Sequence, residues 1–255
     1  MSAASPDDTA RRAIGLLDLT ELGDKATDDD VTTLCARAAG PQGTVAAVCV
    51  WPRHVALAKR QVAAHAVRVA TVVNFPSGED SIDDVVALTK AALADGADEI
   101  DLVLPYRRFL AGDTVHAAAM VDAVRAASAG HTLKVILETG ELPDAAAIRS
   151  AAELAVARGA DFIKTSTGKT PTSASLEATA IMLDVICNVA HTVGLKPSGG
   201  IRTLSDAVAY LDQADLVMGP DWATAATFRF GASGLLTALQ AACDGDTGAS
   251  SKEAY

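Results

Sequence analysis

A chain of 255 residues, half of them hydrophobic, is long enough for one large domain or two small ones and can bury a substantial core. The formal net charge of −11 disfavours binding to the phosphates of nucleic acid or to an anionic membrane face. No apolar stretch has the length of a signal peptide or a membrane span, and the four scattered cysteines lack metal-ligand spacing. These features predict a cytoplasmic protein with free thiols.

Short β-rich runs alternate with helical patterns along the chain. Two helices are expected first, near residues 7–17 and 28–39, the second with Asp28 as its N-cap. Strands are then expected at 45–51, 68–75, 99–105, 134–139, 162–167, 194–198 and 214–219, with a short eighth near 228–231. Helices are expected between and after them, at 53–65, 81–95, 113–129, 143–158, 174–191, 204–212 and 233–243.

Strands that alternate with helices predict right-handed βαβ units and a parallel sheet. Eight such units favour a closed (β/α)₈ TIM barrel over an open sheet, and the length is close to the roughly 250 residues typical of that fold. Because no Pro/Ser linker or shift in composition divides the chain, we expect residues 1–255 to form a single domain. An extra helical segment precedes the barrel, and the polar tail at 244–255 is expected to be mobile.

Alternation along the predicted strands indicates which side chains enter the barrel, because successive residues of a strand point to opposite faces. In EIDLVLP (99–105), alternate apolar residues face the helices, which leaves Asp101 inside together with Glu99 and Val103. Applied to KVILET, FIKTST and GLKPSG, the same rule turns three more charged side chains inward: Glu138, Lys164 and Lys196. They lie near the C-terminal ends of their strands, where enzymes of this fold have their active sites.

Inward lysines need a physical reason, because an unpaired ammonium in a low-dielectric interior is costly and tends to lose its proton. One interpretation is that Lys164 and Lys196 form satisfied ion pairs with Asp101 and Glu138. The other is catalysis, which is favoured because two lysines and two carboxylates converge on one end of the barrel.

The segments that carry these residues match a known family. They are EIDLVLPYRRFLAGD, KVILETGEL, GADFIKTSTGK, LKPSGGIRT and RFGAS, preceded in the chain by LLDLT, AAVCVWPR and ATVVNFP. In this order and at similar separations, they resemble the deoxyribose-phosphate aldolases over most of the chain. GADFIKTSTGK followed by KPSGGIRT is the most specific pair of motifs.

The resemblance implies a class I aldolase with a (β/α)₈ barrel, in which Lys164 forms the Schiff base. Lys196 is then its neighbouring lysine, and Asp101 is the carboxylate that transfers protons. The implied reaction is reversible cleavage of 2-deoxy-D-ribose 5-phosphate to D-glyceraldehyde 3-phosphate and acetaldehyde, in deoxyribose phosphate catabolism. We expect neither a metal nor another cofactor, because the Schiff base is the electron sink and no His/carboxylate cluster with ligand spacing appears among the five histidines.

Glycine-rich loops after the late strands are candidates for a phosphate site, because glycine lets backbone N–H groups approach an anion. The candidate residues are Gly168, Lys169, Gly199, Gly200, Gly231, Ser233 and Gly234, the last of them at the start of a helix whose N-terminus would favour an anion. Each loop alone is a weak signal and is more often just a turn. Three such loops at one barrel end favour a phosphate site.

Several other side chains are weaker candidates, each with a structural alternative. Asp18 and Thr20 are suited to a substrate hydroxyl or to a structural hydrogen bond. Cys49 is expected to be a small buried core residue, with reaction with an aldehyde product as the alternative. Asn74 is a candidate for a contact with the sugar, with a polar strand end as the alternative. Glu138 is expected to pair with a lysine rather than to abstract a proton.

The remaining candidates are exposed or terminal. Arg107 and Arg108 are expected to form an exposed pair in a loop. Tyr255 ends the chain, as a tyrosine does in some members of the family, and its hydroxyl is a candidate for the proton relay; a disordered terminus is the alternative.

Three rival functions remain open at this point. They are a Schiff-base aldolase that uses a ketone donor, a phosphosugar-binding barrel without lyase activity, and a phosphosugar isomerase. In all of them the partners are small molecules, here phosphosugars and aldehydes, with a possible homodimer as the assembly.

Overall fold

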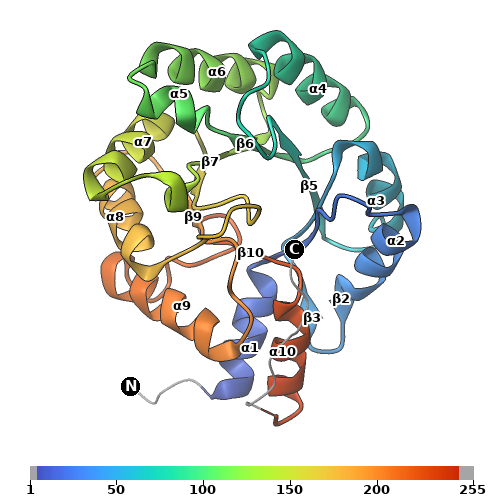
Figure 1. Cartoon of the computed structure of the whole chain (residues 1–255). Coiled ribbons are helices and arrows are strands. Elements are labelled where there is room, and N and C mark those ends of the chain that lie inside the picture. The colour runs from blue at the N-terminus through green and yellow to red at the C-terminus, as the bar shows by residue number, and fades with distance from the viewer. Residues whose placement is uncertain (1–4, 247–255) are drawn as a thin grey trace.

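The computed structural model describes residues 5–246. Within this part of the chain, eight parallel strands form one sheet in the order β10-β1-β4-β5-β6-β7-β8-β9. Parallel bridges from Leu195 to Phe228 and from Ser198 to Gly231 connect β9 with the segment that contains β10. The sheet therefore closes into a barrel, and the helices form a ring around it (Figure 1).

The strands are short and almost entirely buried. The barrel strands are β1 (Leu17–Glu21), β4 (Ala47–Val50), β5 (Arg68–Val73), β6 (Glu99–Val103), β7 (Thr132–Ile136), β8 (Phe162–Lys164), β9 (Gly194–Lys196) and β10 (Phe230–Ala232). A small antiparallel ribbon, β2 (Ala39–Gly40) with β3 (Gly43–Thr44), lies outside this sheet. Burial on both faces explains why the strands read as nearly continuous apolar runs.

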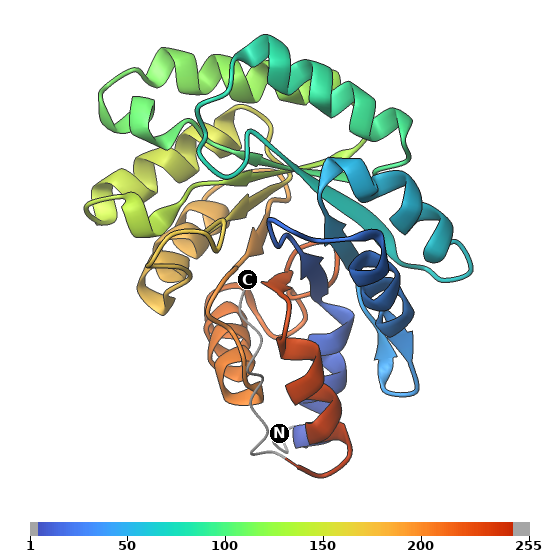
Figure 2. The ribbon, with the colours of Figure 1, turned by 45° about the vertical axis from the view of Figure 1, so that its right-hand side comes forward.

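Helices follow the strands and cover the outside of the barrel. They are α1 (Pro6–Gly15), α2 (Asp28–Arg37), α3 (Val55–Gln61), α4 (Ile82–Ala94), α5 (Tyr106–Leu110), α6 (Thr114–Ala127), α7 (Ala145–Ala157), α8 (Leu176–Cys187), α9 (Leu204–Met218) and α10 (Leu235–Cys243). Two 3₁₀ turns, η1 (Pro52–His54) and η2 (Thr139–Glu141), follow β4 and β7. The N-terminal helix α1 packs beside α10 (Figure 2), so the chain's two described ends meet on one side of the barrel.

The predicted TIM barrel is confirmed, but one of its strands was misplaced. Residues 214–219, expected to be a strand, continue helix α9, and the missing strand is β1, whose first residue had been assigned to a helix. The apolar run misled the prediction because its large side chains are not core residues: Leu216 is 87% exposed.

The predicted N-cap at Asp28 needs a correction. Thr27 caps α2 in place of Asp28, and Thr203 caps α9; each forms a capping box. Arg107 and Arg108 are exposed as expected, yet they lie on the short helix α5 and not in a loop.

The predicted tail begins at residue 244; residues 247–255, including Tyr255, lie outside the described part of the chain. Among residues 5–246, no helix has the length and apolar character needed to cross a membrane.

Candidate active site

Three predicted residues meet inside the barrel. Lys164 and Lys196 are the last residues of β8 and β9 and are paired in register, so their side chains lie next to each other on the inner face. Both Nζ atoms contact the same oxygen, Oδ2 of Asp101 on β6, at 2.9 Å from Lys164 and 2.8 Å from Lys196. In-register parallel strands thus bring together side chains that are far apart in the sequence.

The sequence analysis missed a third lysine in this group. Lys134 of β7 is paired in register with Asp101, and its Nζ lies 2.9 Å from Oδ1 of that carboxylate. It also contacts Oε2 of Glu99 at 2.5 Å. The signal was present in KVILET, because the alternation that turned Glu138 inward also turns Lys134 inward.

Arg229 and Asp18 complete the group. The Arg229 guanidinium donates to Asp18 Oδ1 at 2.6 Å and to Glu99 Oε1 at 2.9 Å, and Lys196 Nζ lies 2.5 Å from Asp18 Oδ2. Arg229 was also missed, although Phe228 and Phe230 on either side of it are both fully buried core residues and imply that it points inward. We call these seven side chains the inner charge cluster: Asp18, Glu99, Asp101, Lys134, Lys164, Lys196 and Arg229.

The inner charge cluster holds four cations and three carboxylates among the described residues, all of them at most 2% exposed. Full ionisation would leave one buried positive charge without compensation, which is costly. Loss of one proton from a lysine balances the cluster. The charge count therefore predicts that one of the three lysines is neutral.

The three lysines differ in the direction in which their surroundings shift the pKa. Burial lowers the pKa of Lys164, and the Lys196 ammonium adds to this effect, so that its one carboxylate contact with Asp101 does not compensate. Burial also disfavours the ammonium of Lys196, but Asp101 and Asp18 hold its pKa well above the usual value. For Lys134, Asp101 and Glu99 likewise outweigh burial and raise the pKa. Of the three lysines, Lys164 is therefore the one that loses its proton most easily.

The carboxylates of the cluster remain ionised. Burial alone would raise the pKa of Asp101, but Lys134, Lys164 and Lys196 hold it well below its usual value. The pKa of Asp18 and that of Glu99 are lowered against burial in the same way, by the cations around them. Asp101 is thus a permanent anion at neutral pH that lies between the two predicted catalytic lysines.

The weaker candidates have varied surroundings. The Thr20 hydroxyl donates to the backbone oxygen of Asp18 at 2.8 Å, which is a structural hydrogen bond. Cys49 is buried inside the barrel, where burial raises the pKa of its thiol to about 11. Asn74 has φ 57°, and its Nδ2 donates to the oxygen of Val103 at 2.9 Å. Thr20 and Cys49 are paired in register on the adjacent strands β1 and β4, so their side chains lie on the same face of the barrel wall.

Glu138 differs from its prediction. None of the described lysines lies within ion-pair distance of it; instead it accepts hydrogen bonds from the hydroxyls of Thr167 at 2.5 Å and Thr170 at 3.2 Å. The reason is its backbone, which has φ 55° and so departs from strand geometry at the end of β7. Burial raises the pKa of Glu138, although the bonds from Thr167 oppose the shift. Glu138 thus anchors the loop that follows Lys164.

The predicted glycine loops converge beside the cluster. Gly168, Gly199 and Gly200 all have φ near 80°, a conformation that favours glycine. The N–H of Gly199 donates to the oxygen of Gly231 at 3.2 Å, and a Cβ at Gly199 would lie 3.3 Å from the Cα of Gly168. The three loops therefore form one surface at the C-terminal end of the barrel.

The helix that follows these loops has a free N-terminus. Gly234 is the N-cap of α10, and no side chain caps the helix, so its first N–H groups are available to an anion. Ser233 precedes it and is partly exposed. Lys169, in contrast, is engaged elsewhere, because its Nζ lies 2.9 Å from Oδ1 of Asp24.

Two further observations bear on ligands. The hydroxyl of Ser166, two residues beyond Lys164, is buried and has no hydrogen-bond partner among the described residues. A buried hydroxyl of this kind is suited to a ligand's polar group. In residues 5–246, no group of three or more His, Cys, Asp or Glu side chains is arranged to hold a metal ion.

Comparison with known proteins identifies the family. The family model for DeoC/LacD aldolases matches residues 12–241. A deoxyribose-phosphate aldolase of Agrobacterium fabrum is 54% identical over 238 residues, which cover 92% of each chain.

Solved structures agree. An apo-form crystal structure from Toxoplasma gondii ME49, provisionally named a deoxyribose-phosphate aldolase, superposes with a TM-score of 0.87 at 27% identity and covers 96% of this chain and 99% of its own. A protein from Coccidioides immitis with the same provisional name gives a TM-score of 0.82 at 32% identity, over 91% of this chain and 85% of its own. This chain belongs to the DeoC/LacD family of aldolases.

Proposed function

We propose that this protein cleaves 2-deoxy-D-ribose 5-phosphate reversibly to D-glyceraldehyde 3-phosphate and acetaldehyde, through a Schiff base on Lys164. One observation carries the proposal: Lys164 and Lys196 contact the same oxygen of Asp101, yet the pKa of the first is lowered and that of the second is raised. Two like groups whose pKa values are driven apart typically serve as a base or nucleophile and an acid. The relative from Agrobacterium fabrum, with its printed name, supports the choice of substrate.

The first step needs a neutral amine. A lysine with the ordinary pKa of about 10.4 is almost fully protonated at pH 7 and cannot attack a carbonyl carbon. The lowered pKa of Lys164 increases its neutral fraction. Its nitrogen then bonds to C1 of the open-chain sugar, and loss of water leaves an iminium ion.

The iminium ion accepts the electrons of the bond that breaks. A base removes the proton of the C3 hydroxyl, C3 becomes the aldehyde carbon of glyceraldehyde 3-phosphate, and the C2–C3 electron pair moves into an enamine of acetaldehyde. Protonation of the enamine at C2 and addition of water to the resulting iminium release acetaldehyde and regenerate Lys164. Because the electron sink is covalent, the proposal includes no metal and no other cofactor.

Asp101 and Lys196 serve as the proton relay in this proposal. The Lys196 ammonium is held by two carboxylates and supplies a proton donor, and Asp101 accepts hydrogen bonds from both lysines. The free hydroxyl of Ser166 is available to a substrate hydroxyl.

The glycine surface is proposed to bind the phosphate. Gly168, Gly199, Gly200 and the residues from 231 to 234 bring backbone N–H groups and the N-terminus of α10 to the same end of the barrel as Lys164. Lys169 is a weaker candidate than the sequence indicated, because Asp24 already pairs with its ammonium.

The remaining parts of the proposal concern the setting of the enzyme. We propose a single barrel domain over residues 1–255, in the cytoplasm, with small phosphosugars and aldehydes as its partners. All four cysteines lie in the described residues and are free thiols, which supports a reducing compartment. A homodimer stays a prediction, as does a role for Tyr255 in the proton relay.

Borohydride trapping tests the Schiff base directly. Reduction in the presence of acetaldehyde should convert Lys164 to N-ethyl-lysine, a net gain of C2H4 in the mass of the peptide that contains it. Lys164→Arg should lose both the adduct and nearly all aldol cleavage, whereas Lys59→Arg, at a lysine paired with Asp98 away from the cluster, should retain both. An adduct on another lysine, or cleavage that survives Lys164→Arg, would refute the assignment.

Donor specificity separates this enzyme from its rivals. Acetaldehyde should act as the donor in synthesis, and dihydroxyacetone should not. A preference for the ketone would indicate a different Schiff-base aldolase, and isomerisation without trapping would indicate an enzyme that works by proton transfer alone.

A further inference from the structure

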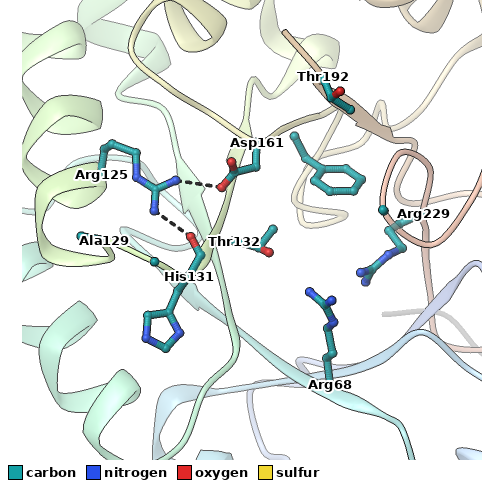
Figure 3. A pocket seen from close by; sticks show the side chains of 11 residues that line it. Arg68, Arg125, Ala129, His131, Thr132, Asp161, Thr192 and Arg229 are labelled. Atoms are coloured by element: carbon teal, nitrogen blue, oxygen red, sulfur yellow. Dashed lines mark hydrogen bonds and ion pairs between the residues drawn. The ribbon is translucent and has the colours of Figure 1, made fainter.

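The inner charge cluster extends to the end of the barrel opposite the glycine loops. Glu99 is the first residue of β6, Arg68 is the first of β5, and Arg229 precedes β10, so all three lie at the N-terminal ends of strands. A cavity of about 690 Å³ opens there, lined in part by Arg68, Thr132, Phe162 and Arg229. In Figure 3 the side chains of Arg68 and Arg229 point toward each other across this cavity.

Glu99 is surrounded by cations at this end. It accepts from Arg229 Nη2 at 2.9 Å and Nη1 at 3.2 Å, lies 2.5 Å from Lys134 Nζ, and is reached by Arg68 Nη1 at 3.3 Å. Arg229 is also enclosed, because its guanidinium lies over the ring of Phe162, 5.6 Å from the centroid. Only Arg68, with 57% of its side chain exposed, connects this group of four to solvent.

Two continuous chains of opposite charges connect this end to the candidate nucleophile. One runs from Glu99 through Lys134 to Asp101 and then to Lys164. The other runs from Glu99 through Arg229, Asp18 and Lys196 to the same oxygen of Asp101. Each contact in both chains is 2.9 Å or shorter.

We infer that Glu99 and Arg229 are positioning residues for catalysis, which keep the Lys164 amine neutral by setting the charge balance of the cluster from the far end of the barrel. The inference rests on the proposed Schiff-base function. With Lys164 neutral, the three remaining cations match the three carboxylates among the described members of the cluster. Glu99 and Arg229 supply one charge of each sign to that balance and contact neither Lys164 nor the glycine loops.

The charge balance predicts in which direction the loss of Glu99 or of Arg229 should shift the pKa of Lys164. Without the negative charge of Glu99, the cluster has a surplus of positive charge, and Lys164 should lose its proton more easily. Without the positive charge of Arg229, the surplus is negative, and Lys164 should hold its proton to higher pH. Loss of structure alone would not move the two variants in opposite directions.

The groups that face Lys164 come from several elements around it. Cys49 on β4, Asp101 on β6, Glu138 after β7 and Lys196 on β9 interact electrostatically with Lys164. Lys134 on β7 and Asp18 on β1 contact its neighbours Asp101 and Lys196. Cys49 stays neutral at physiological pH because burial raises its pKa to about 11. Glu138 has a raised pKa and can titrate in the acid range, but it does so in both variants and so cannot produce shifts of opposite sign.

The test is the pH dependence of kcat/KM for aldol cleavage, whose acid limb reports the free enzyme's essential base. Glu99→Gln should move this limb to lower pH and Arg229→Gln to higher pH, each by about half a pH unit or more if the charges interact at an effective dielectric constant near 20. The double variant restores the balance and should return the limb toward its original position. Glu99→Asp and Arg229→Lys keep the charges and should leave it in place.

Matched controls come from an ion pair outside the barrel. Arg12 and Asp215 form a two-point pair with both Nη–Oδ distances at 2.7 Å. Arg12→Gln and Asp215→Asn remove the same groups as the test variants, and neither should move the acid limb. Thermal melting followed by circular dichroism identifies the variants that fold.

The outcomes are distinct. Shifts in the same direction, or unchanged limbs in folded variants, would overturn the inference while borohydride trapping at Lys164 still supported the proposed function. If neither glutamine variant folds, Arg68→Glu places a carboxylate at the exposed end of the cluster and must still move the limb to higher pH; an unchanged limb would overturn the inference. Failure of trapping would refute the Schiff-base function itself.

Discussion

The two ends of the barrel interior are built from the same residue types but differ in how completely the charges are paired. At the N-terminal end, Arg229 and Lys134 each contact two carboxylates at 2.9 Å or less. At the C-terminal end, Lys164 contacts one carboxylate oxygen, which it shares with Lys196, and the nearby Ser166 hydroxyl has no hydrogen-bond partner within residues 5–246.

This difference shows which end of the barrel interior has incomplete charge compensation. A buried ion pair is strongly destabilised when one partner is removed, because an uncompensated charge remains. The N-terminal end avoids that cost through multiple pairing. The C-terminal end leaves Lys164 with weak compensation, and the resulting lower pKa favours the neutral form that a nucleophilic amine requires.

The largest effect should follow a change at the C-terminal end. Lys196→Met removes the ammonium that lowers the pKa of Lys164 and supplies the proton relay, so kcat/KM should fall by about 10²–10⁴-fold, the usual contribution of general acid–base catalysis. Steady-state cleavage assays measure this loss. Lys59→Met serves as the control, and a comparable loss there, or a loss below tenfold at Lys196, would contradict the assigned role.

For the free energy of unfolding, a change at the N-terminal end should have a larger effect than a change at the C-terminal end. Arg229→Met leaves Asp18 and Glu99 with too little positive charge and should cost about 3–5 kcal/mol of unfolding free energy. Lys164→Met should cost about 1 kcal/mol or less, or stabilise the protein. Because the folded state lowers the pKa of Lys164, it disfavours that ammonium relative to the unfolded chain at pH 7.

Urea denaturation at pH 7 compares these two variants. Equal losses of unfolding free energy would show that the two ends of the barrel do not differ in charge compensation. A larger loss for Lys164→Met would reverse the comparison.

The smallest effect is expected at the exposed end of the cluster. Arg68→Gln removes a contact of 3.3 Å from a side chain that is 57% exposed, and Glu99 keeps its bonds to Arg229 and Lys134. Exposed ion pairs contribute about 0–1 kcal/mol, so the midpoint of urea unfolding should hardly change. A loss of several kcal/mol would mean that Glu99 depends on solvent-facing compensation.

Strand alternation predicted the central part of the site from the sequence. It placed Asp101, Lys164 and Lys196 inside the barrel, and it would have placed Lys134 there if the rule had been applied to the first residue of KVILET. The expected ion pair of Glu138 with a lysine did not form, because a positive φ at that residue departs from strand geometry and its carboxylate accepts from Thr167 and Thr170 instead. The strand expected at 214–219 was wrong, because residues 214–218 belong to helix α9, which exposes Leu216 to solvent.

The sequence by itself determined the class of fold and the inward direction of most charged side chains, because both depend on local periodicity and on the order of the elements. Only the tertiary structure decided which of the three lysines has a lowered pKa. That depends on how many carboxylates reach each ammonium, and the decisive contacts join residues far apart in the chain, such as Arg229 to Asp18 across 211 positions. Barrel closure creates these contacts, and no local pattern in the sequence encodes their distances.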